Sequence, residues 1–280
     1  MNMQKRVLAI NDISCMGKCS LTVALPIISA VGHECVILPT ALLSTHTAQK
    51  FGKFVSFDMA EEMNKIADHW SDMDIGFDAI YTGYITSPEQ AQTVYDIVCR
   101  FKRENTLVVV DPVLGDNGRL YRGFSEKNID ALLRLCSVAD IITPNLTEGA
   151  LLTGIESDGT HITAENAEKM LDALGEICKN RVILTGAETE SGVISTVARD
   201  CVTGETVFFN KPKITGAVHG SGDIFASALT ALCLGKDSFF EAVQGAVNFV
   251  YSAVSDFGAD NESRWYGVNF EKHLCEIKNM

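Results

Sequence analysis

The sequence predicts an α/β fold with a doubly wound, mostly parallel central sheet flanked by helices. Short apolar runs alternate with helical segments through all 280 residues, an order that is typical of parallel sheets. The run Leu107–Val110 is apolar without interruption, as expected for a strand buried on both faces. Because no repeat, low-complexity tract or linker interrupts the chain, we expect residues 1–280 to form a single domain.

The individual elements follow from the apolar pattern in chain order. Apolar runs of strand length occupy residues 7–10, 35–38, 79–81, 107–110, 140–142 and 181–184. Helical stretches cover residues 21–31, 59–70, 88–102 and 224–234, and a further helix begins near Glu148. Ser87 and Pro88 are typical of a helix start, whereas Gly32 and Gly235 are typical stops. Residues 193–198 and 205–209 are predicted to form a hairpin, a small antiparallel addition at an edge of the sheet.

Composition narrows the range of partners and compartments. The net charge of −13 argues against nucleic acid or an anionic membrane as the main partner. We expect no transmembrane helix, because no apolar run approaches 18 residues. Residues 7–10 are too short an apolar core for a signal peptide. Nine scattered cysteines, an odd number, favour reduced thiols in the cytoplasm, and the close pair Cys15 and Cys19 has no second pair to complete a metal site.

The stretch Val218-His219-Gly220-Ser221-Gly222-Asp223 precedes a predicted helix and has the character of an anion site. A glycine-rich loop at a helix N-terminus presents unpaired backbone N–H groups and a partial positive charge. A carboxylate repels phosphate, so Asp223 fits this site if it takes a proton from an attacking hydroxyl while a phosphoryl group is transferred. On these residues alone, an N-capping aspartate is an equally good interpretation.

Polar residues also follow the apolar part of five predicted strands. They are Asp12, Tyr84, Asp111, Asn145 and Thr185, and a further acid, Glu148, follows Asn145. Each residue alone fits a turn or a helix cap. Because the carboxyl ends of parallel strands meet at one edge of the sheet, where open α/β sheets bind ligands, we expect all of them to face the Gly220–Asp223 loop.

Several common enzyme classes are excluded by missing motifs. The sequence has no G-x-x-x-x-G-K-[ST] of a P-loop kinase and no G-x-G-x-x-G after its first strand. It also lacks the G-x-S-x-G of a serine hydrolase and the H-E-x-x-H of a zinc enzyme.

The chain resembles the pyridoxal (pyridoxine/pyridoxamine) kinases of the ribokinase-like superfamily. The resemblance covers nearly the whole length and depends on the order and spacing of five motifs: Ser44-Thr45-His46-Thr47, Thr82-Gly83-Tyr84, Asp111-Pro112-Val113-Leu114-Gly115, Thr143-Pro144-Asn145 with Glu148, and Gly220-Ser221-Gly222-Asp223. It implies ATP-dependent phosphorylation of a hydroxymethyl group on a pyridine ring.

The resemblance assigns roles to the motif residues. Asp223 becomes the base at the 5′-hydroxyl, and the amides of Gly220, Ser221 and Gly222 hold the transferring phosphoryl group. Asp111 and Glu148 place Mg²⁺ and its waters on ATP, and Asn145, Thr185 and Gly186 line the nucleotide phosphates, with Ser221 and Gly222. An aspartate with the ordinary pKa of about 4 is a weak base for an alcohol, so we expect most of the catalysis to come from positioning and charge neutralisation.

On the substrate side, Asp12, Thr47 and Tyr84 match positions that hold the ring, and Ser44 belongs to the same motif. Many relatives carry serine where this chain has Asp12, and a carboxylate there favours a protonated ring nitrogen or an amino group. The residues His219-Gly220-Ser221-Gly222 are also similar to the loop of hydroxymethylpyrimidine kinases, which usually presents cysteine in place of Asp223. A hydroxymethylpyrimidine kinase of thiamin synthesis and a non-catalytic vitamer- or nucleotide-binding protein therefore remain as alternatives.

The resemblance further implies a homodimer and a requirement for a monovalent cation such as K⁺. Residues 116–124, which contain two glycines, are a candidate for a loop that closes over ATP. We expect Lys18 to be exposed and solvated, with a phosphate contact as the alternative. We interpret His46 as a hydrogen-bonded loop histidine.

Overall fold

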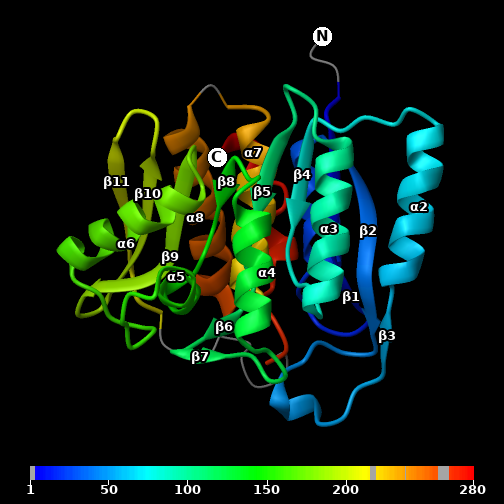
Figure 1. Ribbon diagram of the computed structural model, residues 1–280. Coiled ribbons are helices and arrows are strands. Elements are labelled where there is room, and N and C mark those ends of the chain that lie inside the picture. Colours follow the sequence, from blue (N-terminus) through cyan, green and yellow to red (C-terminus); the bar gives the residue numbers. More distant parts are fainter. Residues whose placement is uncertain (1–3, 215–218, 237, 258–264) are drawn as a thin grey trace.

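A nine-stranded sheet forms the centre of the molecule in the computed structural model, which describes residues 4–214, 219–236, 238–257 and 265–280 (Figure 1). Val218, the first residue of the predicted loop, lies outside the described residues. The strand order is β11-β10-β9-β8-β5-β4-β1-β2-β3. The six strands from β9 to β2 in this order run parallel, and β3, β10 and β11 are antiparallel to their neighbours. The strands are β1 (Arg6–Ser14), β2 (Glu34–Leu43), β3 (Ser56–Asp58), β4 (Ala79–Thr82), β5 (Leu107–Val110), β8 (Ile141–Ile142), β9 (Arg181–Glu190), β10 (Val193–Asp200) and β11 (Thr206–Pro212).

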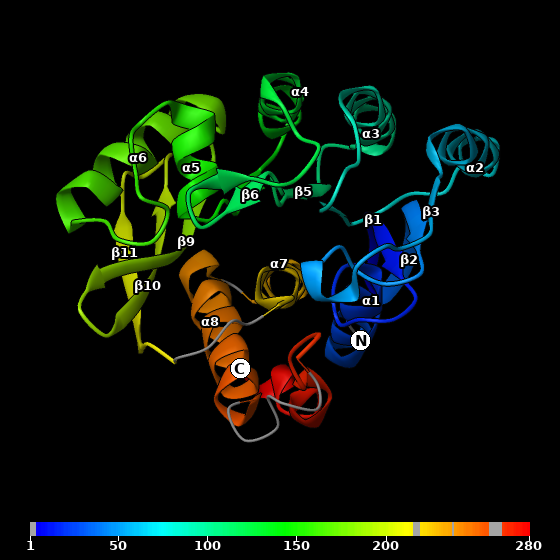
Figure 2. The same ribbon diagram turned by 90° about the horizontal axis from the view of Figure 1, so that it is seen from below.

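Helices cover both faces of this sheet (Figure 2). On one face lie α2 (Ala60–Asp72), α3 (Pro88–Phe101), α4 (Glu126–Cys136), α5 (Leu146–Thr153) and α6 (Ala164–Ile177). On the other lie α1 (Leu21–Val31), α7 (Ser221–Cys233) and α8 (Phe239–Phe257), with the short helices η2 (Phe270–His273) and η3 (Ile277–Asn279). The remaining elements are η1 (Gln49–Phe51) and a hairpin of β6 (Gly115–Asp116) and β7 (Arg119–Leu120). The predicted fold class is therefore confirmed, and no described helix has the length and apolar character needed to span a membrane.

Two predicted strand ends are wrong. β1 continues through Asp12 to Ser14, because β2 pairs with it in parallel beyond a register shift at Asp12. β9 continues through Thr185 to Glu190, because the antiparallel strand β10 supplies partners that a parallel neighbour does not. Thr185 and Gly186 together oppose one residue of β10, a β-bulge in which Gly186 has a φ of 67°.

Helix α7 also begins earlier than predicted. Gly220 is its N-cap with a φ of 84°, so Ser221, Gly222 and Asp223 form the first turn rather than a loop. A β-carbon on Gly220 would lie 2.1 Å from the carbonyl oxygen of Lys18, which only a residue without a side chain avoids. The glycine therefore lets the start of α7 pack directly against the segment that follows β1.

Candidate active site

The carboxyl edge of the sheet brings three predicted site residues together. Tyr84, Asp111 and Asn145 come just after the ends of β4, β5 and β8, which are neighbours in the sheet. The first turn of α7 lies against the same edge, since a β-carbon on Gly222 would be 3.9 Å from Oδ2 of Asp111. The free backbone N–H groups of a helix N-terminus thus adjoin a buried carboxylate.

Asp223 lies in this first turn and is partly buried. Its Oδ1 accepts a hydrogen bond of 3.4 Å from Nδ2 of Asn11. Burial, followed by the nearby carboxylate of Asp12, raises the pKa of Asp223 to about 7, although hydrogen bonds from the Ser20 backbone and Asn11 oppose the rise. The premise of an ordinary pKa of about 4 is therefore wrong for this carboxyl, which is poised to exchange a proton near neutral pH.

Asp12 is a buried carboxylate near Asp223, and protein hydroxyls donate hydrogen bonds to both of its carboxylate oxygens. Its Oδ1 accepts a hydrogen bond from Oγ of Ser20, and its Oδ2 accepts one of 2.9 Å from Oγ of Ser14. Burial raises its pKa and these two hydrogen bonds oppose the rise. Pairing of Asp12 with a ring nitrogen or an amino group stays a prediction that would use the second lone pair of each oxygen.

Asp111 and Glu148 form a second acidic group beside the start of α7. Burial, then the carboxylates of Glu148 and Asp223, raise the pKa of Asp111 well above its ordinary value, and the hydroxyl of Thr143 opposes this. Burial also raises the pKa of Glu148 to about 8, against the effect of backbone N–H donors. Ionised carboxylates packed this closely call for a neighbouring positive charge.

Glu148 is also part of a helix cap. Its Oε2 accepts a hydrogen bond of 2.9 Å from the backbone N–H of Asn145, and the Asn145 side chain accepts one of 2.9 Å from the Glu148 N–H. Its Oε1 accepts a hydrogen bond of 3.0 Å from the backbone N–H of Leu114. This is a capping box at the start of α5, two residues before the predicted helix start at Glu148.

These residues fit a magnesium ion held partly by substrate. Among the described residues no cluster of three His, Cys, Asp or Glu could hold a metal on its own. Mg²⁺ commonly binds one or two carboxylates and takes its remaining ligands from water and phosphate oxygens. Asp111 suits a direct ligand. The carboxylate of Glu148 already accepts hydrogen bonds from several backbone N–H groups, so its remaining acceptor capacity suits a hydrogen bond from a metal-bound water.

Asn145 and Thr185 lie side by side next to this acidic group. The N–H of Thr185 donates to the carbonyl of Pro144 at 2.9 Å, and Asn145 and Thr185 form an isolated parallel bridge. Nδ2 of Asn145 donates to the carbonyl of Gly115 at 2.9 Å. Gly186 is exposed at the bulge that follows. The placement of these residues is compatible with the predicted phosphate contacts, which stay a prediction.

The segment that contains Ser44 and Thr47 lies near the start of α7 through contacts of His46. His46 donates from its backbone N–H to the carbonyl of Met16 at 3.2 Å, and its ring lies 5.4 Å from that of His219, next to Gly220. Ser44 is exposed, and its hydroxyl accepts a 2.9 Å bond from the N–H of Val55, whereas Thr47 is exposed beside it. His46 is a hydrogen-bonded loop histidine as predicted, because its ring nitrogens contact the Tyr266 carbonyl and the Ala48 N–H.

Sequence reasoning missed three residues at this edge. Phe124 stacks on Tyr84 with ring centroids 5.9 Å apart, and Tyr121 is close enough to Glu148 for that carboxylate, after burial, to raise the pKa of its hydroxyl. Both lie at the end of segment 116–124, just after β7, so this part of the segment lies near Glu148 and beside Tyr84. The sequence signal for these two residues was their aromatic character in a glycine-containing segment. The third missed residue is Asn11, for which the sequence contained no signal.

Lys18 contradicts its predicted exposure. Its side chain is 14% exposed, and its Nζ binds Glu271 and the side-chain oxygen of Asn269, each at 2.8 Å. The backbone of Lys18 also packs against Gly220 and Gly267. Lys18 therefore joins the segment after β1 to the C-terminal residues.

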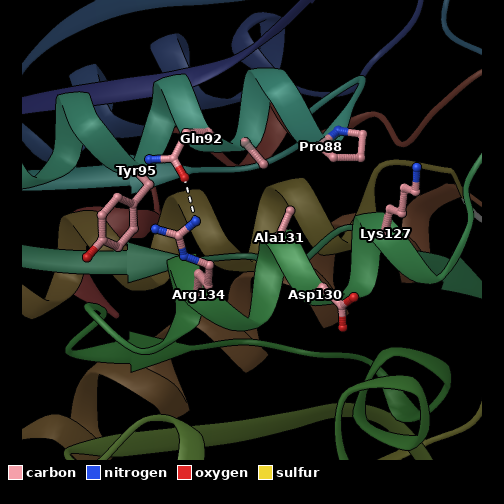
Figure 3. Close-up of a pocket in the computed structure, with 8 residues that line it drawn as sticks. Pro88, Gln92, Tyr95, Lys127, Asp130, Ala131 and Arg134 are labelled. Carbon is pink, nitrogen blue, oxygen red and sulfur yellow. Dashed lines mark hydrogen bonds between the residues drawn. The ribbon is translucent and has the colours of Figure 1, made fainter.

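A groove of about 290 Å³ lies elsewhere, between α3 and α4 (Figure 3). Arg134 on α4 donates a 2.6 Å hydrogen bond to Gln92 on α3 and lies 5.2 Å from the ring centre of Tyr95. None of the predicted site residues lines this groove, so it has no part in the chemistry at the sheet edge.

Known proteins resemble the chain across this whole architecture. A family model described as phosphomethylpyrimidine kinase matches residues 28–264. The pyridoxal kinase of Dictyostelium discoideum is 25% identical over 99% of this chain and 93% of its own length. The solved pyridoxal kinase of Lactobacillus plantarum is 30% identical with a TM-score of 0.89, covering 98% of this chain and 96% of that one. A Bacteroides thetaiotaomicron structure assigned as a phosphomethylpyrimidine kinase, in a crystal form with pyridoxal, is 35% identical with a TM-score of 0.91 over 99% of this chain and 96% of that one.

Proposed function

Because the chain belongs to the phosphomethylpyrimidine kinase family of ribokinase-like proteins, we propose that it is an ATP-dependent kinase acting on a B6 vitamer. The product would be the 5′-phosphate of pyridoxal, pyridoxine or pyridoxamine. The Lactobacillus plantarum and Dictyostelium discoideum relatives are pyridoxal kinases, and the Bacteroides thetaiotaomicron relative was crystallised with pyridoxal.

The observation that carries the proposal is the position of Asp223. It lies in the first turn of α7, next to the amides of Gly220 to Gly222, and its pKa of about 7 leaves it partly ionised at neutral pH. Its carboxylate takes the hydroxyl proton as the substrate oxygen forms a bond to the γ-phosphorus. The bond from that phosphorus to the bridging oxygen breaks, and ADP leaves with the electron pair.

The remaining residues bind, orient and neutralise charge. The backbone N–H groups of Gly220, Ser221 and Gly222 would donate hydrogen bonds to the equatorial phosphoryl oxygens, where preorganised donors stabilise the charge of the transition state. Asp111 and Glu148 would hold Mg²⁺, which neutralises phosphate charge when bound. Asn145, Thr185 and Gly186 would contact the nucleotide phosphates. On the substrate side Asp12, Ser44, Thr47 and Tyr84 would surround the ring, and segment 116–124 would cover ATP.

We also propose the finer properties that accompany this family. They are a homodimer, dependence on a monovalent cation such as K⁺, and activity in the cytoplasm. The nine cysteines of the chain are all free, which supports a reducing compartment.

The second candidate is a hydroxymethylpyrimidine kinase, which the description of the matching family favours. The two functions use the same catalytic groups and differ in the ring. An amino group on a pyrimidine, like that of pyridoxamine, would suit the carboxylate of Asp12.

The deciding experiment measures ADP production with Mg·ATP against pyridoxal, pyridoxine, pyridoxamine and hydroxymethylpyrimidine side by side. We expect turnover of the pyridines to exceed that of the pyrimidine. Asp223→Ala should lower turnover at least about a hundredfold with nearly unchanged ATP affinity. The reverse ring preference would assign the protein to thiamin synthesis. Ligand binding without ADP release would leave a non-catalytic binding protein.

A further inference from the structure

The amide of Asn11 occupies a central place beside Asp223. Asn11 is fully buried in β1, and its side chain makes three hydrogen bonds, one within β1 and two to other segments. Its Oδ1 accepts from the backbone N–H of Asp12 at 3.0 Å and from that of Tyr84 at 2.7 Å. Its Nδ2 donates to Oδ1 of Asp223 at 3.4 Å.

These contacts allow only one orientation of the amide group. If the amide were reversed, two backbone N–H groups would face the NH₂ group, and two buried donors would lose their acceptor. The NH₂ group therefore always faces Asp223. A bond of 3.4 Å is long for an N–H donor, and catalytic hydrogen bonds in ligand-free structures often shorten when substrate binds.

The glycine of Thr82-Gly83-Tyr84 supports this arrangement. A β-carbon on Gly83 would lie 2.1 Å from Nδ2 of Asn11, far inside van der Waals contact. Gly83 thus provides the space in which the amide reaches Asp223, which gives the glycine of this motif a physical reason.

We propose that Asn11 is the positioning residue of the catalytic base. By occupying Oδ1 of Asp223 with a fixed donor, it leaves the other carboxylate oxygen for the substrate hydroxyl. By accepting the hydrogen bond from the N–H of Tyr84, it fixes the position of Asp223 relative to the segment that contains Tyr84. This inference rests on the proposed kinase function. It adds a residue that acts through Asp223 rather than by contact with ATP or the vitamer.

Other groups around Asp223 bear on the test. The carboxylates that face it are Asp12 and Asp111, and the thiol or phenol groups in electrostatic contact with it are Cys19, Tyr81 and Tyr121. The hydroxyl of Tyr81 is buried close to the side chains of Asn11 and Ser227. Because Asn11 donates its hydrogen bond to Asp223 directly, its replacement should move the ionisation of Asp223 more than that of the other acids.

The first variant is Asn11→Asp, which keeps an acceptor for both backbone N–H groups and replaces the donor with an acid. Two acids side by side ionise in coupled steps, so the acid limb of kcat/KM should move at least about one pH unit upward. Turnover at pH 7 should fall at least about fivefold and recover in part at pH 9. Asn128→Asp, a buried asparagine in the cap of α4, is the matched control and should leave the profile in place.

The second test is a double-mutant cycle of Asn11→Ser with Asp223→Ala. If Asn11 acts through Asp223, Asn11→Ser should lower turnover in the wild type but not the residual turnover of Asp223→Ala. An unmoved acid limb, or an equal loss in both backgrounds, would overturn the inference and leave Asn11 as a structural residue only.

A third measurement is independent of turnover. The pH dependence of urea unfolding reports the ionisation of Asp223, and Asn11→Ser should displace it to higher pH because the carboxylate loses a donor. An undisplaced curve would contradict the positioning role. If the wild type phosphorylates none of the four rings while this displacement occurs, the proposed function fails and the contact between Asn11 and Asp223 stands.

Discussion

Replacing Asp223 with asparagine should stabilise the protein at neutral and alkaline pH while it abolishes most turnover. The folded protein holds the Asp223 proton more tightly than the unfolded chain, because burial and Asp12 raise its pKa from 3.8 to about 7. The stabilising effect of this proton is fully present below pH 3.8 and is lost as pH rises through 7. Asparagine has no such proton to lose, so Asp223→Asn should escape this loss.

The size of the effect follows from the change in pKa. A rise from 3.8 to about 7 corresponds to about 4 kcal/mol if the full shift counts. Because the side chain is only partly buried, solvent screening reduces this to roughly 2 kcal/mol. For a chain of 280 residues this is roughly 3 °C in Tm.

Urea unfolding at pH 5 and pH 8.5 measures the difference directly. The free energy of unfolding of Asp223→Asn, relative to wild type, should be larger at pH 8.5 than at pH 5. Asp130→Asn, on the exposed side of α4, is the control and should give the same difference at both pH values. Parallel pH curves for wild type and Asp223→Asn would refute the raised pKa, and with it the case for Asp223 as a base near neutral pH.

Further predictions concern the metal site, the start of α7 and the C-terminal contact. Asp111→Asn should raise the Mg²⁺ concentration for half-maximal turnover at least about tenfold, seen in a magnesium titration at saturating ATP, because it removes a carboxylate ligand. Gly222→Ala should leave the urea midpoint nearly unchanged, since its β-carbon meets Asp111 only at 3.9 Å, yet lower turnover by crowding the phosphate. Gly220→Ala should lower both the urea midpoint and turnover, because its β-carbon would lie 2.1 Å from a backbone oxygen. Equal urea midpoints for Gly220→Ala and Gly222→Ala would contradict this geometry. Lys18→Met should lower the free energy of unfolding by about 1–2 kcal/mol, because it breaks the ion pair with Glu271, and should leave the KM for ATP unchanged. A raised KM for ATP would instead support the alternative that Lys18 contacts phosphate.

The sequence predicted the site best where the chain itself ends a strand. Tyr84, Asp111 and Asn145 follow apolar strands whose parallel neighbours force their ends to one edge, and the structure places them there. Asp12 and Thr185 were placed beyond strands that in fact continue. Whether pairing continues past the apolar run depends on the neighbouring strand, which the local pattern does not contain.

The sequence by itself determined the α/β class, the antiparallel edge addition and the position of Tyr84, Asp111 and Asn145 at the sheet edge, because all of these depend on local periodicity and chain order. Only the tertiary structure decided how those residues behave. Asn11 and Asp223 are 212 residues apart in the chain, and their contact arises from the packing of α7 against α1 and β4, the neighbours of β1. The pKa of Asp223 is set by burial and by Asp12, and Lys18 is bound by Glu271 near the other end of the chain. Electrostatic environment and hydrogen-bond partners are properties of distances in space, and for that reason no local pattern specified them.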